Sequence, residues 1–375
     1  LIKRLQYMTS GRLLRDDINM LWLIALTILA FYFAMFYRSQ TFIETNYESG
    51  KTPPIFRILL KIFVRVLRRR QGRIYCAALK HGKTRLGGKE TEKKGDDEAK
   101  VEHIPPSDDE IIVINNYRVT KELLEQYKTV CGDKSNDVNE TVPLCFPECL
   151  FIYNLLLLVC KPSFKLSPFG LIHLGQTIKQ HENLQQLLDA PCSLETQTTD
   201  YRWVPRGVEV DISVRVIAAS GKCVWSGVAT LLSRSKQAQS SGGAASVSRQ
   251  QSNDPAWENQ DRCTRQEIKV AGDTGVKYAG VSGDWNPHHL YPWSARLLGY
   301  RAPIAHGLWT LAKAVTLVSE SSENPFKFTE VEGKFKRPLF LPGTAILEHY
   351  TEGSSIKFRV IDSKTQAPHL VGSLS

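Results

Sequence analysis

The chain has 375 residues, of which 42% are hydrophobic, and a formal net charge of +10. It is long enough for two domains with real cores, and its eight cysteines are too sparse for a disulfide-dense secreted scaffold. Residues 1–82 hold 14 Lys or Arg against 4 Asp or Glu, so the positive charge is concentrated at the N-terminus. A nucleic-acid-binding domain would carry that charge on a folded face, so the distribution argues against nucleic acid as a partner.

Residues 20–37, which read MLWLIALTILAFYFAMFY, are the first recognisable element. Eighteen residues without a charge can just cross a bilayer core as a helix. A signal peptide is the alternative, but its apolar region would be shorter and would end in small residues. This run ends in FYFAMFYRSQ instead, so the sequence predicts a retained single-pass transmembrane helix. The basic residues that follow it predict a cytosolic C-terminal part.

A basic amphipathic helix is predicted over residues 55–70. Four basic residues recur at helical spacing on one side, and apolar residues fill the other: Arg57, Lys61, Arg65 and Arg68 against Ile58, Leu59, Ile62, Phe63 and Val66. Such a helix suits an anionic membrane surface, and an ordinary surface helix packed on the folded part is the alternative. We therefore interpret residues 1–82 as a membrane anchor with a basic segment. Residues 83–110 are charged, carry almost no bulky apolar residues and are predicted to be a linker.

Two globular halves follow, at residues 111–234 and 263–375, with a Ser/Gly/Gln-rich flexible linker at residues 235–262 between them. Each half pairs one long apolar helix pattern with strand patterns. The first has a buried helix at 146–160, a strand within 167–180 and a hairpin over 208–234; the second has a helix at 303–321 followed by strands at 327–364. Curved antiparallel sheets wrapped around a central helix are the simplest α+β architecture with this order.

The stretch YAGVSGDWNPHHLYPWSARLLGYRAPIAHG, residues 278–307, carries the candidate chemistry. Its turn-forming residues can place Asp284 and His289 on the same side of a cavity, where a carboxylate and an imidazole can hold one water and move protons. Gly307 lies near the start of the apolar helix, where free N–H groups stabilise negative charge. This combination suits a reaction at a carbonyl or at the carbons next to it. A polar surface turn without catalysis is the alternative.

The same stretch resembles the hydratase motif of MaoC-like dehydratases, the (R)-specific enoyl-CoA hydratases. The matching residues are Ser282, Gly283, Asp284, Asn286, Pro287 and His289, and then Ala295, Gly299, Tyr300, Ala305, His306 and Gly307. The resemblance implies a double hotdog over residues 111–375, and the transmembrane helix predicted from the uncharged run precedes it. It also implies a hydro-lyase of fatty acid metabolism without metal or cofactor, which adds water to a trans-2-enoyl thioester of CoA or of acyl-carrier protein. It does not cover the N-terminal anchor, and oligomerisation stays open.

The resemblance also implies the roles of the site residues. Asp284 and His289 would form the catalytic dyad, and the Gly307 amide would bind the thioester oxygen. Ser282, Gly283 and Asn286 would hold and orient the loop, and His306 would fix it. The sequence departs from the motif at His288, where the family prefers an aliphatic residue, so the dyad is assigned to His289 by its spacing from Asp284.

The first half lacks this motif, so one site per chain is expected, with the first half shaping the acyl tunnel. His173 in that half is interpreted as a packed, hydrogen-bonded histidine. Cys145 and Cys149 have no second pair at zinc-finger spacing, so no zinc site is predicted. Two alternatives to a hydratase remain: a non-catalytic module that binds acyl thioesters or proteins, and a thioesterase of the same fold class.

Overall fold

The computed structural model describes residues 43–75, 103–133, 141–235, 257, 263–321 and 328–375. The apolar run predicted to span a membrane lies outside these residues. Among the helices that are described, none has the length and apolarity needed to cross a bilayer. All elements discussed below belong to the compact unit from Thr45 to Ser375.

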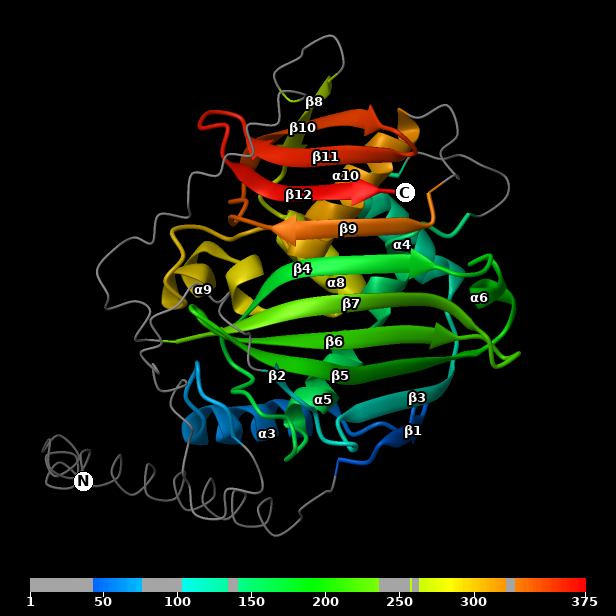
Figure 1. The fold of residues 1–375 in the computed structure, drawn as a ribbon, viewed down its shortest axis with the longest axis vertical. Helices are drawn as coiled ribbons and strands as arrows, with labels where there is room; N and C mark the ends of the chain where they lie inside the picture. The colour runs from blue at the N-terminus through cyan, green and yellow to red at the C-terminus, as the bar shows by residue number, and fades with distance from the viewer. Residues whose placement is uncertain (1–42, 76–102, 134–140, 236–256, 258–262, 322–327) are drawn as a thin grey trace, which may run out of the picture. The chain divides into compact units, whose positions relative to one another are not determined.

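A single sheet of twelve strands runs through this unit (Figure 1), in the order β1-β3-β5-β6-β7-β4-β9-β12-β11-β10-β8, with β2 paired to β5. Neighbouring strands are antiparallel except for the parallel pair β1 and β3. The strands of the first part are β1 (Asn46–Glu48), β2 (His103–Ile104), β3 (Ile111–Tyr117), β4 (Leu171–Gln180), β5 (Cys192–Val204), β6 (Gly207–Ile217) and β7 (Cys223–Arg234). Those of the second are β8 (Thr264–Val270), β9 (Glu330–Phe335), β10 (Gly343–Glu352), β11 (Ser355–Asp362) and β12 (Pro368–Leu374).

The first half confirms the predicted hairpin, which β6 and β7 form. Alternate residues of β6 enter the core because successive side chains of a strand point to opposite faces: Val208, Val210, Ile212, Val214 and Val216 are all buried. The helix predicted over 146–160 is divided in two, a 3₁₀ helix η1 (Phe146–Leu150) with Pro147 in its first turn and the helix α5 (Ile152–Cys160). Two further helices are α4 (Lys121–Cys131) and α6 (Gln186–Asp189).

The second half packs its strands against α10 (Gly307–Glu320), which lies behind the sheet in Figure 1. Of the apolar stripe predicted for this helix, Leu311, Ala312, Val315 and Val318 lie in the core, and Leu308 is half-buried. Helix α8 (Thr274–Ser282), the short 3₁₀ helix η3 (Pro287–His289) and helix α9 (Pro292–Leu297) precede it. The site residues come from the segments between these helices.

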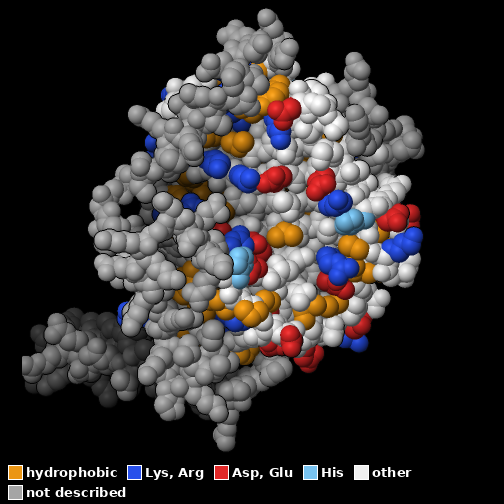
Figure 2. All heavy atoms as spheres, in the orientation of Figure 1, with side chains coloured by type: hydrophobic (Ala, Val, Ile, Leu, Met, Phe, Trp, Pro, Cys, Tyr) orange, Lys and Arg blue, Asp and Glu red, His pale blue; other side chains and the backbone are white. Residues whose placement is uncertain are grey.

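Strands β4 and β9 join the two halves into one continuous sheet. Their register runs antiparallel from Gly175 opposite Lys334 to Lys179 opposite Glu330. Helix α5 of the first half packs against β3 and β5, and α10 of the second half packs against β11 and β12, as an α+β hotdog requires. On the sheet face visible in Figure 2, Lys and Arg side chains alternate with Asp and Glu rather than gathering into a basic stripe.

Residues near the N-terminus pack on the first half, although the sequence grouped them with the membrane segment. Strand β1 pairs with β3, and helix α3 (Ile55–Arg68) packs against α5. Only Ile58 of this helix is buried. One side of α3 therefore packs on the folded part, as the alternative interpretation of this helix expected.

The predicted linker at residues 83–110 is shorter than expected at its C-terminal end, since residues 103–110 belong to the folded unit. The Glu110 side chain is fully buried, with one oxygen 2.5 Å from Lys165 Nζ and the other 2.6 Å from the Tyr201 hydroxyl. A buried carboxylate costs little free energy only when it is paired and hydrogen-bonded, and both conditions hold here. Composition alone could not show these partners, which lie 55 and 91 residues away.

Candidate active site

The turn that presents Asp284 is built by the end of α8. Gly283 has φ of +73°, a left-handed conformation that favours glycine and ends the helix. The Ser282 hydroxyl donates to the Tyr278 carbonyl at 2.9 Å and accepts the Asp284 N–H at 3.2 Å. Ser282 and Gly283 therefore shape the turn, as their place in the motif implied, and Asp284 emerges from it.

The segment after the turn positions His289. The carboxylate of Asp284 accepts the backbone N–H of Asn286 at 3.2 Å, and the Asn286 carbonyl accepts the N–H of His289 at 2.9 Å. The Nδ1 atom of His289 lies 2.8 Å from the Ile304 carbonyl oxygen. A carbonyl only accepts, so Nδ1 carries the proton and Nε2 presents a lone pair.

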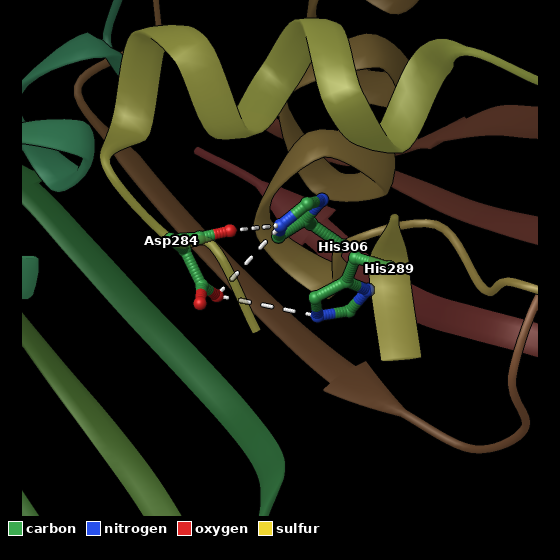
Figure 3. Close-up of side chains that lie close together, drawn as sticks. All are labelled: Asp284, His289 and His306. Carbon is green, nitrogen blue, oxygen red and sulfur yellow. Dashed lines mark hydrogen bonds and ion pairs between the residues drawn. The ribbon is translucent and has the colours of Figure 1, made fainter. Parts of the chain in front are cut away.

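Asp284, His289 and His306 converge in Figure 3. The distance from Asp284 Oδ2 is 4.0 Å to His289 Nε2 and 3.8 Å to His306 Nε2. Both distances exceed a direct hydrogen bond, so the carboxylate and the His289 lone pair face each other across a gap that a bridging water can occupy. The side chain of Asp284 is 31% exposed while that of His289 is nearly buried, so solvent reaches the pair from the carboxylate side.

His306 acts on the other two residues. Its Nε2 lies 3.0 Å from the Asp284 backbone carbonyl, and its ring stacks on His289 at a centroid distance of 3.6 Å. Tyr278 packs against the same ring at 5.0 Å. The position of His306 therefore fits the predicted role of fixing the loop.

Burial sets the protonation of the histidines. It lowers the pKa of His289 well below its ordinary value, with the neighbouring His306 and His288 acting in the same direction. Burial also lowers the pKa of His306 to about 4. Both rings are therefore neutral at pH 7, and the Nε2 atom of His289 is free to accept a proton.

The same three residues form a cluster whose ligand atoms lie within 4.8 Å of one another, a spacing that a metal ion can use. However, the Nε2 atom of His306 must carry a proton to bond the Asp284 carbonyl, and a protonated nitrogen cannot be a ligand. Two ligands remain, which is fewer than the three protein ligands of a typical catalytic zinc site. The geometry favours proton transfer over metal binding.

Gly307 is the first residue of α10, directly after His306. The first N–H groups of a helix have no partner within the helix, so this amide can bind an oxygen that gains negative charge. A Cβ atom at position 307 would lie 3.0 Å from the ring of Phe335, closer than nearly all real contacts. Glycine thus fits beside Phe335 at a position where a larger residue would push against the ring.

The first half, which was expected to shape the acyl tunnel, places one residue next to the candidate site. The ring of His173, on β4, lies 4.7 Å from that of Phe335, at the β4–β9 junction. Its Nε2 bonds the Gln176 side-chain oxygen at 3.0 Å, and burial lowers the pKa of His173 to about 4, although nearby Asp284 acts to raise it. A bulge after His173 redirects the strand there. His173 is hydrogen-bonded, as predicted from the sequence. Its ring also packs on Phe335, the residue that lies beside Gly307.

His288 does not face Asp284 as His289 does. Its ring lies 4.0 Å from that of His289 and 5.4 Å from that of Tyr300, and its backbone carbonyl accepts the N–H of Ile304. These contacts hold the segment that supplies the Ile304 carbonyl. The assignment of the dyad to His289 stays a prediction that this geometry favours.

Residues 255–372 match the family model of the MaoC like domain. The chain contains a MaoC-like dehydratase domain. It is 27% identical to 3-hydroxyacyl-thioester dehydratase X of Mycobacterium tuberculosis over 204 residues. This match covers 54% of this chain and 68% of that protein. It is 36% identical over 87 residues to peroxisomal multifunctional enzyme type 2 of Drosophila melanogaster, covering 23% of this chain and only 14% of that protein.

Solved structures agree on the fold of the folded unit. The crystal structure of HtdX of Mycobacterium tuberculosis superposes with a TM-score of 0.55 at 21% identity, over 70% of this chain and 98% of that one. The full-length multifunctional enzyme type 2 of Drosophila melanogaster gives 0.55 at 20% identity, over 71% of this chain and 48% of that one. The predicted α+β hotdog is confirmed. The prediction of a hydro-lyase is confirmed at the level of enzyme class by the matched domain and the named relatives.

Proposed function

We propose that the chain interconverts trans-2-enoyl and (R)-3-hydroxyacyl thioesters by adding or removing water, as a step of fatty acid metabolism. The observation that carries this proposal is the 4.0 Å gap between Asp284 Oδ2 and His289 Nε2, beside the start of α10. The names of the relatives support it, since one is a 3-hydroxyacyl-thioester dehydratase and another, from Arabidopsis thaliana, is a peroxisomal enoyl-CoA hydratase 2.

In the hydration direction, the dyad holds a water molecule and accepts one of its protons as the oxygen bonds to C3 of the enoyl group. The electron pair of the C2–C3 double bond moves toward the thioester, and the carbonyl oxygen gains negative charge beside the Gly307 amide. A proton from the dyad then reaches C2, which completes the addition of one water. Dehydration follows the same steps in reverse.

The first half is proposed to form the other wall of the acyl site. His173 packs on Phe335, and a side chain at position 283 would touch Ile152 of α5, so the first half lies close to both the amide and the loop. It carries no second copy of the motif, so one site per chain is expected.

A chain-length series of trans-2-enoyl-CoA thioesters tests the reaction. Loss of enoyl absorbance, formation of the (R)-3-hydroxyacyl product and no release of free CoA are expected. Release of thiol without hydration would identify a thioesterase instead. Saturable binding of the enoyl thioester without turnover in either direction would identify the alternative, a non-catalytic hotdog module.

We also propose that residues 20–37 anchor the chain as a single transmembrane helix, with the folded unit on the cytosolic side. The support is the sequence alone: 18 uncharged residues followed by a basic segment. Retention in the membrane after alkaline carbonate extraction, with the folded unit open to added protease in sealed microsomes, is the expected result. Extraction into the supernatant would contradict the anchor.

A further inference from the structure

Helix α3 exposes a row of large apolar side chains to solvent. Five of them are 47–68% exposed: Ile55, Phe56, Leu59, Phe63 and Leu67. Residues three and four apart lie on one face of a helix, so Phe56, Leu59, Phe63 and Leu67 form a continuous stripe. Single exposed apolar residues are common, but a row of this length marks an interaction surface.

The folded unit holds the helix in this orientation. The guanidinium of Arg65 donates to the Val159 carbonyl at 2.6 Å, and that of Arg69 donates to the carbonyls of Phe164 and Leu166. Ile58 is buried on the same side. Arg65 and Arg69 thus attach the helix to the protein, and this attachment turns the apolar stripe outward.

We propose that this stripe inserts into the boundary between headgroups and acyl chains of an anionic phospholipid bilayer. Aromatic and aliphatic side chains on one face of a surface helix bind that boundary, and basic residues at its edge attract anionic headgroups. Arg57, Arg68 and Arg70 are exposed beside the stripe. The uncharged run ends at Tyr37, and only 17 residues separate it from Ile55, so both elements can reach the same membrane.

The stripe is also connected to the wall of the candidate site. Just after α3, Gln71 donates to the Phe169 carbonyl at 3.2 Å, and the Gly72 N–H donates to the Ser233 hydroxyl at 2.9 Å. Phe169 and Ile172 are exposed apolar residues directly before His173 on the chain. Docking through α3 therefore brings the His173 edge of the site near lipid. The relevance to long acyl substrates rests on the proposed function, whereas the docking itself does not.

The test uses the full chain with the double substitution Leu26→Arg/Leu29→Arg, which prevents residues 20–37 from spanning a bilayer. Flotation with vesicles of phosphatidylcholine and phosphatidylserine then reports the remaining surface binding. Adding Phe56→Glu and Phe63→Glu is expected to weaken that binding by at least about tenfold, because two aromatic side chains leave the lipid. Leu297→Glu, at a residue of α9 that is 79% exposed, is the matched control and should bind as before.

Melting temperature separates loss of docking from loss of folding and should not change, because both phenylalanines are exposed. Hydration of a short enoyl-CoA is measured in parallel, so failure of the proposed reaction is seen independently of lipid binding. Equal flotation with and without the two glutamates would overturn the proposal, as would no flotation of the Leu26→Arg/Leu29→Arg chain. A dimer that Phe63→Glu dissociates in light scattering, with flotation unchanged, would assign the stripe to a second copy instead.

Discussion

The Nε2 atom of His289 lies 4.0 Å from Oδ2 of Asp284, while Nδ1 of the same ring is bound to the Ile304 carbonyl. The first distance leaves space for a water, and the second fixes which nitrogen can take its proton. Ile304 belongs to the segment just before α10, so the chain that starts the helix also orients the base. The dyad and the Gly307 amide are therefore held by one short stretch of backbone.

Asp284→Asn keeps the shape of the side chain and removes its capacity to accept a proton. We expect hydration of an enoyl-CoA to fall by about 10²- to 10⁴-fold, the usual contribution of a positioned acid or base. Asp273→Asn is the matched control, since Asp273 is an exposed acid at the start of α8 that pairs with Lys277. Steady-state kinetics with unchanged melting temperatures would establish the difference, and equal activity of the two variants would exclude Asp284 from the reaction.

His288→Ala and His289→Ala distinguish the two possible registers of the motif. Only His289 points a free nitrogen at the Asp284 carboxylate, so its loss should cost about 10²- to 10⁴-fold in kcat. Loss of His288 removes ring contacts with His289 and Tyr300, so a much smaller decrease is expected. The reverse ranking would place the base at position 288.

Gly307→Ala tests the amide at the start of α10. The added methyl would press on the ring of Phe335, beside the amide that is proposed to bind the thioester oxygen. We expect kcat/KM to fall by about 10²- to 10³-fold, the usual effect of losing one oxyanion donor. Gly280→Ala, at an exposed helical glycine with nothing within 4 Å, provides the control. Similar activity of the two variants would mean that the reacting group lies elsewhere.

Glu148→Gln tests a buried carboxyl in the first half. Burial raises the pKa of Glu148 from 4.5 to about 8, although Gln176 donates a hydrogen bond to it. Because the folded state keeps this proton and the unfolded chain loses it, the free energy of unfolding falls by about 1.4 kcal/mol per pH unit from pH 4.5 toward 8. The variant should lose this dependence and be more stable than the parent at pH 8. Parallel denaturation curves at all pH values would contradict the assignment.

Local patterns predicted the parts of the site that lie close together in sequence. Asp284, His289 and Gly307 sit within one 24-residue stretch, and the spacing rules of turns and helix starts apply there. His173 and Phe335 could not be found in this way, because they meet only through the pairing of β4 with β9. Long-range pairing of this kind is set by tertiary packing, which a single sequence does not display.

For the fold as well, elements with a clear local pattern were predictable and elements that depend on tertiary packing were not. The hairpin of β6 and β7 and the helix α10 have clear periodic patterns and were predicted. Strand β5, which reads CSLETQTTDYRWV, was missed because its buried positions include Thr196 and Thr198, which look polar in a sequence pattern. The hydrogen bonds of Arg65 and Arg69 that orient α3 were also not foreseeable, since their acceptors lie in α5 and in the loop after it.

The central claim is that Asp284 and His289 act on one water as a unit, and a double-mutant cycle measures this most directly. Hydration of a trans-2-enoyl-CoA is compared among the parent, Asp284→Asn, His289→Ala and the double variant. Residues that act as a unit are non-additive, so the double variant should lose about as much activity as the more damaged single variant. A double variant whose loss equals the product of the two single losses would show independent roles and contradict the account.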